Sequence, residues 1–200
     1  MTLGYILSKV GRNVDAMTEG IRFGIVALQD KPWDELVRLW QKFEALGFDS
    51  TWIADHFVNY ANPTGPWLEG WTTLAALANS TSRIRIGTLV TSISLRNPAL
   101  LARQAMTVDH ISGGRLELGI GAGAPGRVDS SYRMIGIDDW PFQERAERLR
   151  EQVEIVDGLL RNITSSYNGK YYKIEDAMMA PGPIQKPRPP IVVAAHAKAL

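Results

Sequence analysis

Cysteine is absent from the 200-residue sequence, and histidine is scarce, with only His56, His110 and His196. The absence of cysteine excludes disulfide bonds, thiolate metal sites and a cysteine nucleophile. The three histidines share no short spacing typical of metal ligands, so we predict no metal site. No apolar run approaches the roughly 20 residues that cross a bilayer, and we expect no membrane partner.

An excess of charge of one sign is also missing. The 22 basic residues nearly balance 21 acidic ones, which excludes an electrostatic case for binding nucleic acid. With 45% apolar residues, the composition is that of a globular protein with one core, which we expect in the cytoplasm. Residues 1–20 are expected to be a leader unlike a signal peptide, because Lys9 and Arg12 follow its apolar start. The domain is expected over 21–200.

Strand signals alternate with helix signals along this domain. Short apolar runs predict strands over 21–28, 50–54, 84–90, 115–120 and 191–195. Apolar periodicity and capping residues predict helices over 33–46, 71–79, 98–111 and 141–160. A polar loop is expected over 124–140, and a small hairpin or an extended excursion over 168–174. The alternation predicts parallel strands with right-handed crossovers, which fits an open doubly wound sheet or a closed barrel.

In both architectures, ligands bind at the carboxyl ends of the strands. Three segments directly follow or end predicted strands there: residues 55–56, 89–92 and 121–126. We therefore single out His56 as a candidate catalytic residue. The candidate cofactor-binding residues are Asp55, Leu89, Val90, Thr91, Ser92 and Gly123.

The pair Asp55-His56 supports two interpretations. Histidine moves protons near neutral pH, and the carboxylate before it could orient the ring or bind a cofactor atom. Alternatively, both residues only cap the loop. Asp109-His110 lies near the end of an amphipathic helix, where a structural role is favoured. The role of His196, just past the last predicted strand, stays open.

Aromatic residues crowd the loop after the second strand, at Phe57, Tyr60, Trp67 and Trp71. They suit a lid over a planar ligand, or a cluster that pins a long loop. We expect Tyr60 and Trp67 to line a substrate site. Residues 119–124 fit the G-x-G-x-x-A dinucleotide pattern, but no helical periodicity follows them. The other interpretation is that small residues there allow close approach of a flat ring or a backbone.

Four runs of sequence resemble the bacterial luciferase-like monooxygenase superfamily, and within it the deazaflavin (coenzyme F-420) dependent oxidoreductases. They are 52–57 (WIADHF), 81–88 (TSRIRIGT), 96–104 (RNPALLARQ) and 109–123 (DHISGGRLELGIGAG). The resemblance covers about 21–200. It implies a (β/α)8 barrel of the TIM type, of which the N-terminal portion with about five βα units is present.

The resemblance also implies redox chemistry on a small organic substrate, with the cofactor ring carrying the hydride. Asp55 and His56 match residues that lie near the ring in related enzymes, and His56 would handle the proton. The bond Leu89–Val90 matches a cis peptide behind the ring. Coenzyme F-420 is the favoured cofactor and FMN the alternative. A homodimer is expected for the full-length form.

Two departures from the family leave rival functions open. The first is Ala124, which stands where some relatives carry an acid. The second is length: about three further βα units of a full barrel are missing, so we expect a C-terminally truncated chain. The first alternative function is an FMN-dependent monooxygenase that uses reduced flavin and oxygen. The second is a non-catalytic partial barrel that associates with another subunit.

Overall fold

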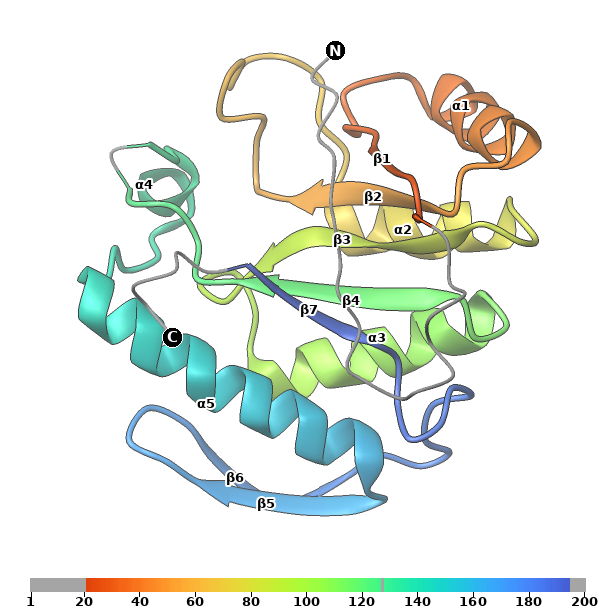
Figure 1. The fold of residues 1–200 in the computed structure, drawn as a ribbon. Helices are drawn as coiled ribbons and strands as arrows, with labels where there is room; N and C mark the ends of the chain where they lie inside the picture. The colour runs from red at the N-terminus through yellow and green to blue at the C-terminus, as the bar shows by residue number, and fades with distance from the viewer. Residues whose placement is uncertain (1–20, 127, 195–200) are drawn as a thin grey trace.

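Five parallel strands form the centre of the structure, a computed structural model that describes residues 21–126 and 128–194 (Figure 1). Strand order follows chain order, β1-β2-β3-β4-β7, and every neighbouring pair is parallel. A doubly wound sheet reverses its order at a switch point, so this order is that of a barrel. The strands are β1 (Gly24–Val26), β2 (Ser50–Asp55), β3 (Arg85–Ser92), β4 (Leu116–Gly121) and β7 (Ile191–Ala194).

The four predicted helices are confirmed, with ends that differ little from the predicted ones. They are α1 (Trp33–Ala45), α2 (Gly70–Asn79), α3 (Pro98–Ile111) and α5 (Phe142–Arg161). Asn97 caps α3 as its sequence indicates, since its side chain accepts hydrogen bonds from the backbone N–H groups of Ala99 and Leu100 at 2.9 and 3.3 Å. Within the described residues, no helix combines the length and apolar character needed to span a membrane.

The core lies between the sheet and these helices. Every residue of β2 and β4 is buried, as expected for parallel strands covered on both faces. Strands β3 and β4 approach each other closely at two glycines. A side chain on Gly87 would overlap the carbonyl oxygen of Glu117, and one on Gly119 would overlap that of Thr88. This confirms the interpretation that small residues in this region allow a close backbone approach.

Three boundaries differ from the predictions. The expected polar loop over 124–140 contains a short helix, α4 (Ser131–Ile135), whose single turn is too short to show apolar periodicity. The hairpin is longer than expected, with strands β5 (Thr164–Asn168) and β6 (Lys173–Met178), so residues 168–174 cover little more than its turn. Strand β1 is shorter than expected. The leader over 1–20 and His196 lie outside the described residues.

The segment between the hairpin and β7 is fastened to the end of α3. The Asp109 carboxylate accepts hydrogen bonds from the backbone and the side-chain amide of Gln185, at 3.0 and 2.7 Å. His110 Nε2 lies 2.7 Å from the carbonyl oxygen of Gly182. The structural role predicted for Asp109 and His110 is therefore confirmed.

Candidate functional site

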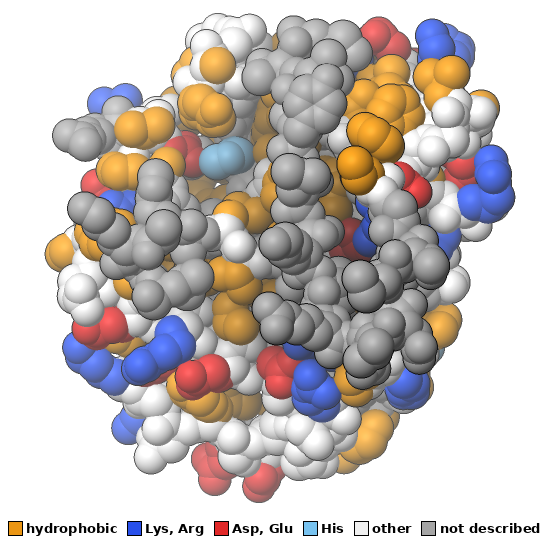
Figure 2. Space-filling model, viewed as in Figure 1, with side chains coloured by type: hydrophobic (Ala, Val, Ile, Leu, Met, Phe, Trp, Pro, Cys, Tyr) orange, Lys and Arg blue, Asp and Glu red, His pale blue; other side chains and the backbone are white. Residues whose placement is uncertain are grey.

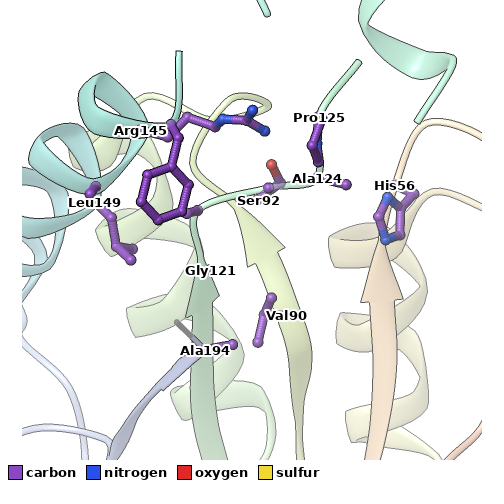
Figure 3. A pocket seen from close by; sticks show the side chains of 13 residues that line it. His56, Val90, Ser92, Gly121, Ala124, Pro125, Arg145, Leu149 and Ala194 are labelled. Carbon is purple, nitrogen blue, oxygen red and sulfur yellow. The ribbon is translucent and has the colours of Figure 1, made fainter. Parts of the chain in front are cut away.

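A cavity of about 660 Å³ opens at the carboxyl ends of the strands, within the size range of small-molecule sites (Figure 3). His56 contributes to it from the end of β2, and Val90 and Ser92 from β3. The chain beyond β4, which includes Gly123, forms a surface of small residues. Arg145 of α5 lies opposite His56 across the cavity in Figure 3. In the space-filling view, a histidine side chain is visible next to hydrophobic side chains (Figure 2).

His56 is held on three sides. Its Nδ1 lies 2.8 Å from Oδ2 of Asp129, and its backbone oxygen accepts a hydrogen bond from Trp67 Nε1, also at 2.8 Å. The ring of Tyr60 meets the imidazole edge-on, with 5.5 Å between ring centroids. The His56 side chain is 21% exposed, which leaves it accessible from the cavity. The functional interpretation of His56 therefore has a geometry that supports it.

Asp129 is a site residue that the sequence analysis missed. It lies 73 positions from His56, in the segment expected to be a loop, and its side chain is only 5% exposed. Burial opposes ionisation, but hydrogen bonds from His56 and Ser131 outweigh it and lower the pKa of Asp129 to about 2. No local spacing links the two residues, so the sequence offers no signal for this pair.

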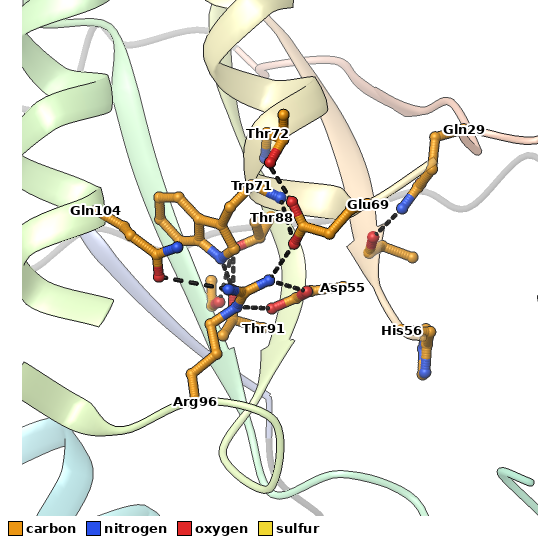
Figure 4. A network of polar contacts seen from close by, with 12 residues as sticks. Gln29, Asp55, His56, Glu69, Trp71, Thr72, Thr88, Thr91, Arg96 and Gln104 are labelled. Carbon is orange, nitrogen blue, oxygen red and sulfur yellow. Dashed lines mark hydrogen bonds and ion pairs between the residues drawn. The ribbon is translucent and has the colours of Figure 1, made fainter. Parts of the chain in front are cut away.

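Asp55 faces a different set of partners (Figure 4). Its carboxylate accepts two hydrogen bonds from Arg96, at Nε (2.6 Å) and at a terminal nitrogen (2.7 Å). Arg96 also donates to Glu69, which caps α2 by accepting hydrogen bonds from the N–H groups of Trp71 and Thr72. Burial opposes the charge on Arg96, but its bonds with Asp55 and Glu69 raise its pKa. Asp55 is buried and does not line the cavity.

Residues 89–92 divide between two sides of β3. The cis peptide predicted at Leu89–Val90 is confirmed, and the pairing with β4 shifts register between Gly87 and Thr91. Val90 and Ser92 line the cavity, whereas Leu89 and Thr91 do not. The Thr91 hydroxyl is buried and accepts a hydrogen bond from Trp71 Nε1 at 3.0 Å.

The aromatic residues of the second loop also divide between the two proposed roles. Trp71 is buried, and Trp67 holds the backbone of His56, so both pin the loop. Phe57 and Tyr60 are more than half exposed, and Tyr60 contacts the imidazole. Neither of the two residues predicted to line a substrate site is among the residues that line the cavity: Tyr60 contacts the imidazole of His56, and Trp67 bonds its backbone oxygen.

Gly123 has a left-handed φ of 76° and lies against hydroxyl groups. A side chain at this position would overlap the hydroxyl of Tyr132 in α4 and that of Ser92. The Tyr132 hydroxyl is also 3.0 Å from that of Ser94. Glycine is therefore required for the turn and for close packing, and it contributes no side chain to this part of the cavity wall.

Arg145 is the second residue that the sequence analysis missed. Its side chain is 9% exposed, and its Nε has no hydrogen-bond partner within residues 21–126 and 128–194. The nearest carboxylate, that of Asp139, lies 3.7 Å from a terminal nitrogen. A buried guanidinium with unused donors next to a cavity suits an anionic group of a ligand. The sequence did contain a signal for Arg145. It lies three residues after Phe142 and four before Leu149, so a charged residue interrupts the apolar face of α5.

Comparisons with known proteins agree with this architecture. The sequence profile of the family described as luciferase-like monooxygenase matches residues 5–200. An F420-dependent glucose-6-phosphate dehydrogenase of Amycolatopsis mediterranei is 35% identical over 76% of this chain and 45% of its own length. The oxygenase component of a flavin-dependent trigonelline monooxygenase of Acinetobacter baylyi is 34% identical over 84% of this chain and 44% of its own length.

A solved structure shares the fold. The coenzyme F420 dependent tetrahydromethanopterin reductase of Methanopyrus kandleri superimposes with a TM-score of 0.72 and 28% identity, over 87% of this chain and 50% of the other. The chain thus spans about half the length of these relatives, as a partial barrel of the TIM type. The family match covers nearly all of the sequence. The chain belongs to the luciferase-like monooxygenase family.

Proposed function

We propose that this chain carries part of the active site of an oxidoreductase that transfers a hydride between coenzyme F-420 and a small organic substrate. The observation that carries the proposal is one cavity with a histidine on one side and, on the other, a buried arginine whose Nε has no hydrogen-bond partner among the described residues. The chain beyond β4 and Val90 would meet the flat ring, and Arg145 would bind the anionic tail. When bound, the deazaflavin supplies the hydride chemistry.

The chain's own residues would position the reactants and move a proton. His56 would accept or deliver the proton of the substrate as the hydride moves. Ser92 and Gly123 would contact the ring, and Tyr60 would contact the substrate. Asp55, Leu89 and Thr91, also predicted to bind cofactor, lie outside the cavity lining, so we propose a supporting role for them.

The relatives named above support both cofactors. The F420-dependent dehydrogenase and reductase favour the deazaflavin, and the trigonelline monooxygenase favours a flavin as the alternative, with oxygen as co-substrate. The substrate itself stays unassigned. The homodimer implied by the resemblance and the cytoplasmic location expected from the composition also stay predictions, and size-exclusion chromatography of the full-length protein tests the first.

The decisive experiment is a fluorescence titration of the purified protein with coenzyme F-420 and, separately, with FMN. We expect tighter binding of coenzyme F-420. Arg145→Ala should weaken it at least about 10-fold, since hydrogen bonds to charged groups contribute about 1.5–3 kcal/mol. The control is Arg150→Ala, which removes an exposed positive charge from the same helix.

Each other outcome has a defined meaning. Tighter binding of FMN would favour the monooxygenase. Binding of neither cofactor would favour the non-catalytic partial barrel. Equal losses in Arg145→Ala and Arg150→Ala would mean that net charge, and not the buried guanidinium, determines affinity.

A further inference from the structure

Of the 13 described residues that line the cavity, His56 is the only one with an imidazole, and none has a carboxyl group. Ala124 and Pro125, at the place where some relatives carry an acid, line the same cavity and have no titratable group. Among the described residues that line the cavity, His56 is therefore the candidate for proton transfer. Which of its two nitrogens carries the proton then decides whether it can accept one from a substrate.

Asp129 controls that choice by its position. An ionised carboxylate only accepts hydrogen bonds, so a contact of 2.8 Å with Nδ1 requires the proton to be on Nδ1. Within the described residues, Nε2 of His56 has no hydrogen-bond partner, and its lone pair is left for a molecule in the cavity. A neutral imidazole in this state accepts a proton through Nε2.

Asp129 is itself fixed in place. Its second oxygen, Oδ1, accepts a hydrogen bond from the backbone N–H of Ser131 at 2.9 Å. The backbone N–H of Asp129 donates to the carbonyl oxygen of Pro125 at 3.1 Å. The carboxylate is thus oriented by the turn that follows β4, and it cannot rotate away from His56 without losing a hydrogen bond.

We propose that Asp129 is the positioning residue of this site: it keeps the proton of His56 on Nδ1 and presents Nε2 as the proton acceptor. This rests on the proposed function: Nε2 would take the proton in the oxidative direction and return it in the reverse direction. The substrate would be one that loses a proton to Nε2 while the adjacent carbon gives a hydride to the cofactor, as when an alcohol becomes a carbonyl compound. The O–H bond and the C–H bond break, and the C=O bond forms.

The first test needs neither cofactor nor substrate. The 200-residue chain labelled with ¹⁵N-histidine contains three imidazoles, and the His56→Asn spectrum identifies the signals of His56. Two-bond ¹H–¹⁵N correlations report which nitrogen is protonated. We expect the Nδ1–H form in the unmodified protein and a clear shift toward Nε2–H in Asp129→Ala. Asp138→Asn, which removes an exposed carboxylate of the same segment, should leave the spectrum unchanged.

The second test measures single-turnover hydride transfer by the cofactor-loaded full-length protein. We expect Asp129→Ala to lower the rate about 10-fold or more, within the factor of about 100–10,000 that an acid–base group supplies. Cofactor affinity should change little, and Asp129→Glu should restore part of the rate. Circular dichroism checks that each variant is folded.

An unchanged tautomer in both Asp129→Ala and Asp129→Asn would overturn the proposal and leave Asp129 as a loop anchor. So would a changed tautomer with an unchanged transfer rate. If the unmodified protein binds no cofactor, the proposed function is overturned instead. The tautomer spectrum distinguishes this outcome from a failure of the Asp129 proposal, because it needs no cofactor.

Discussion

Asp55 and His56 are consecutive in the chain, yet they belong to two polar clusters of opposite character. Asp55 is 2% exposed and is paired with Arg96 through two hydrogen bonds, in a cluster behind the cavity. His56 is 21% exposed and uses one ring nitrogen, with the other left unpaired within the described residues. A fully paired cluster stabilises the fold, whereas a partly paired one next to a cavity keeps a group available for a ligand.

The largest effect should come from breaking the buried cluster. Arg96→Ala leaves the Asp55 carboxylate buried without its partner, and we expect the free energy of unfolding to fall by about 3–5 kcal/mol. Urea denaturation measures it. The control is Arg38→Ala, which breaks an exposed pair with Asp34 and should cost under about 1 kcal/mol. Similar losses in both variants would contradict the structural role of the cluster.

Replacing His56 should affect catalysis and not stability. For the full-length protein with its substrate, we expect His56→Asn to lower turnover at least about 100-fold, the lower bound for an acid–base group. Cofactor affinity should change little. His110→Asn is the control, since His110 bonds the backbone of Gly182 away from the cavity. A near-normal single-turnover rate in His56→Asn would show that His56 is a loop anchor.

Glu69 tests whether the buried cluster extends into α2. Glu69→Ala removes the side-chain cap of α2 and one partner of Arg96, so the free energy of unfolding should fall by about 1–2 kcal/mol. Glu35→Ala, in the first turn of α1, removes an exposed acid that caps nothing. A loss as small as that of Glu35→Ala would confine the cluster to Asp55 and Arg96.

The smallest expected effect is the pH dependence of the stability that the His56–Asp129 pair provides. The pKa of Asp129 is lowered in the folded state to about 2 from 3.8, so its stabilisation is complete above about pH 4 and is lost as pH falls through 2. Because its partner His56 is partly exposed, solvent screens the interaction, and we expect a contribution of about 1 kcal/mol. The stability difference between the unmodified protein and Asp129→Asn should therefore shrink between pH 6 and pH 2.

Much of the fold was predictable because its signals are local. The apolar runs of β2 and β4, the Asn97-Pro98 start of α3 and the alternation of strands with helices are each visible within a few residues. The resemblance added the choice of a barrel and the position of the cis peptide. Helix α4 was missed because five residues are too few for a periodic pattern.

The candidate site was predictable in part, for a related reason. His56, Val90, Ser92 and Gly123 follow from the rule that ligands bind at the carboxyl ends of strands. The rule gives the end of the sheet at which a ligand binds, but not the direction of each side chain. It therefore placed Asp55 in the same site as His56, although Asp55 does not line the cavity. The contact of His56 with Asp129 depends on how a 73-residue separation folds, which no local pattern records.

The close approach of β3 and β4 at Gly87 and Gly119 has a consequence for large-scale mutagenesis. Neither position lines the cavity, yet even alanine would place an atom on a backbone oxygen of the neighbouring strand. A screen for activity would therefore record both as intolerant of every substitution, as it would a catalytic residue. A parallel screen for protein abundance would separate them, because abundance should collapse at these glycines and persist at His56.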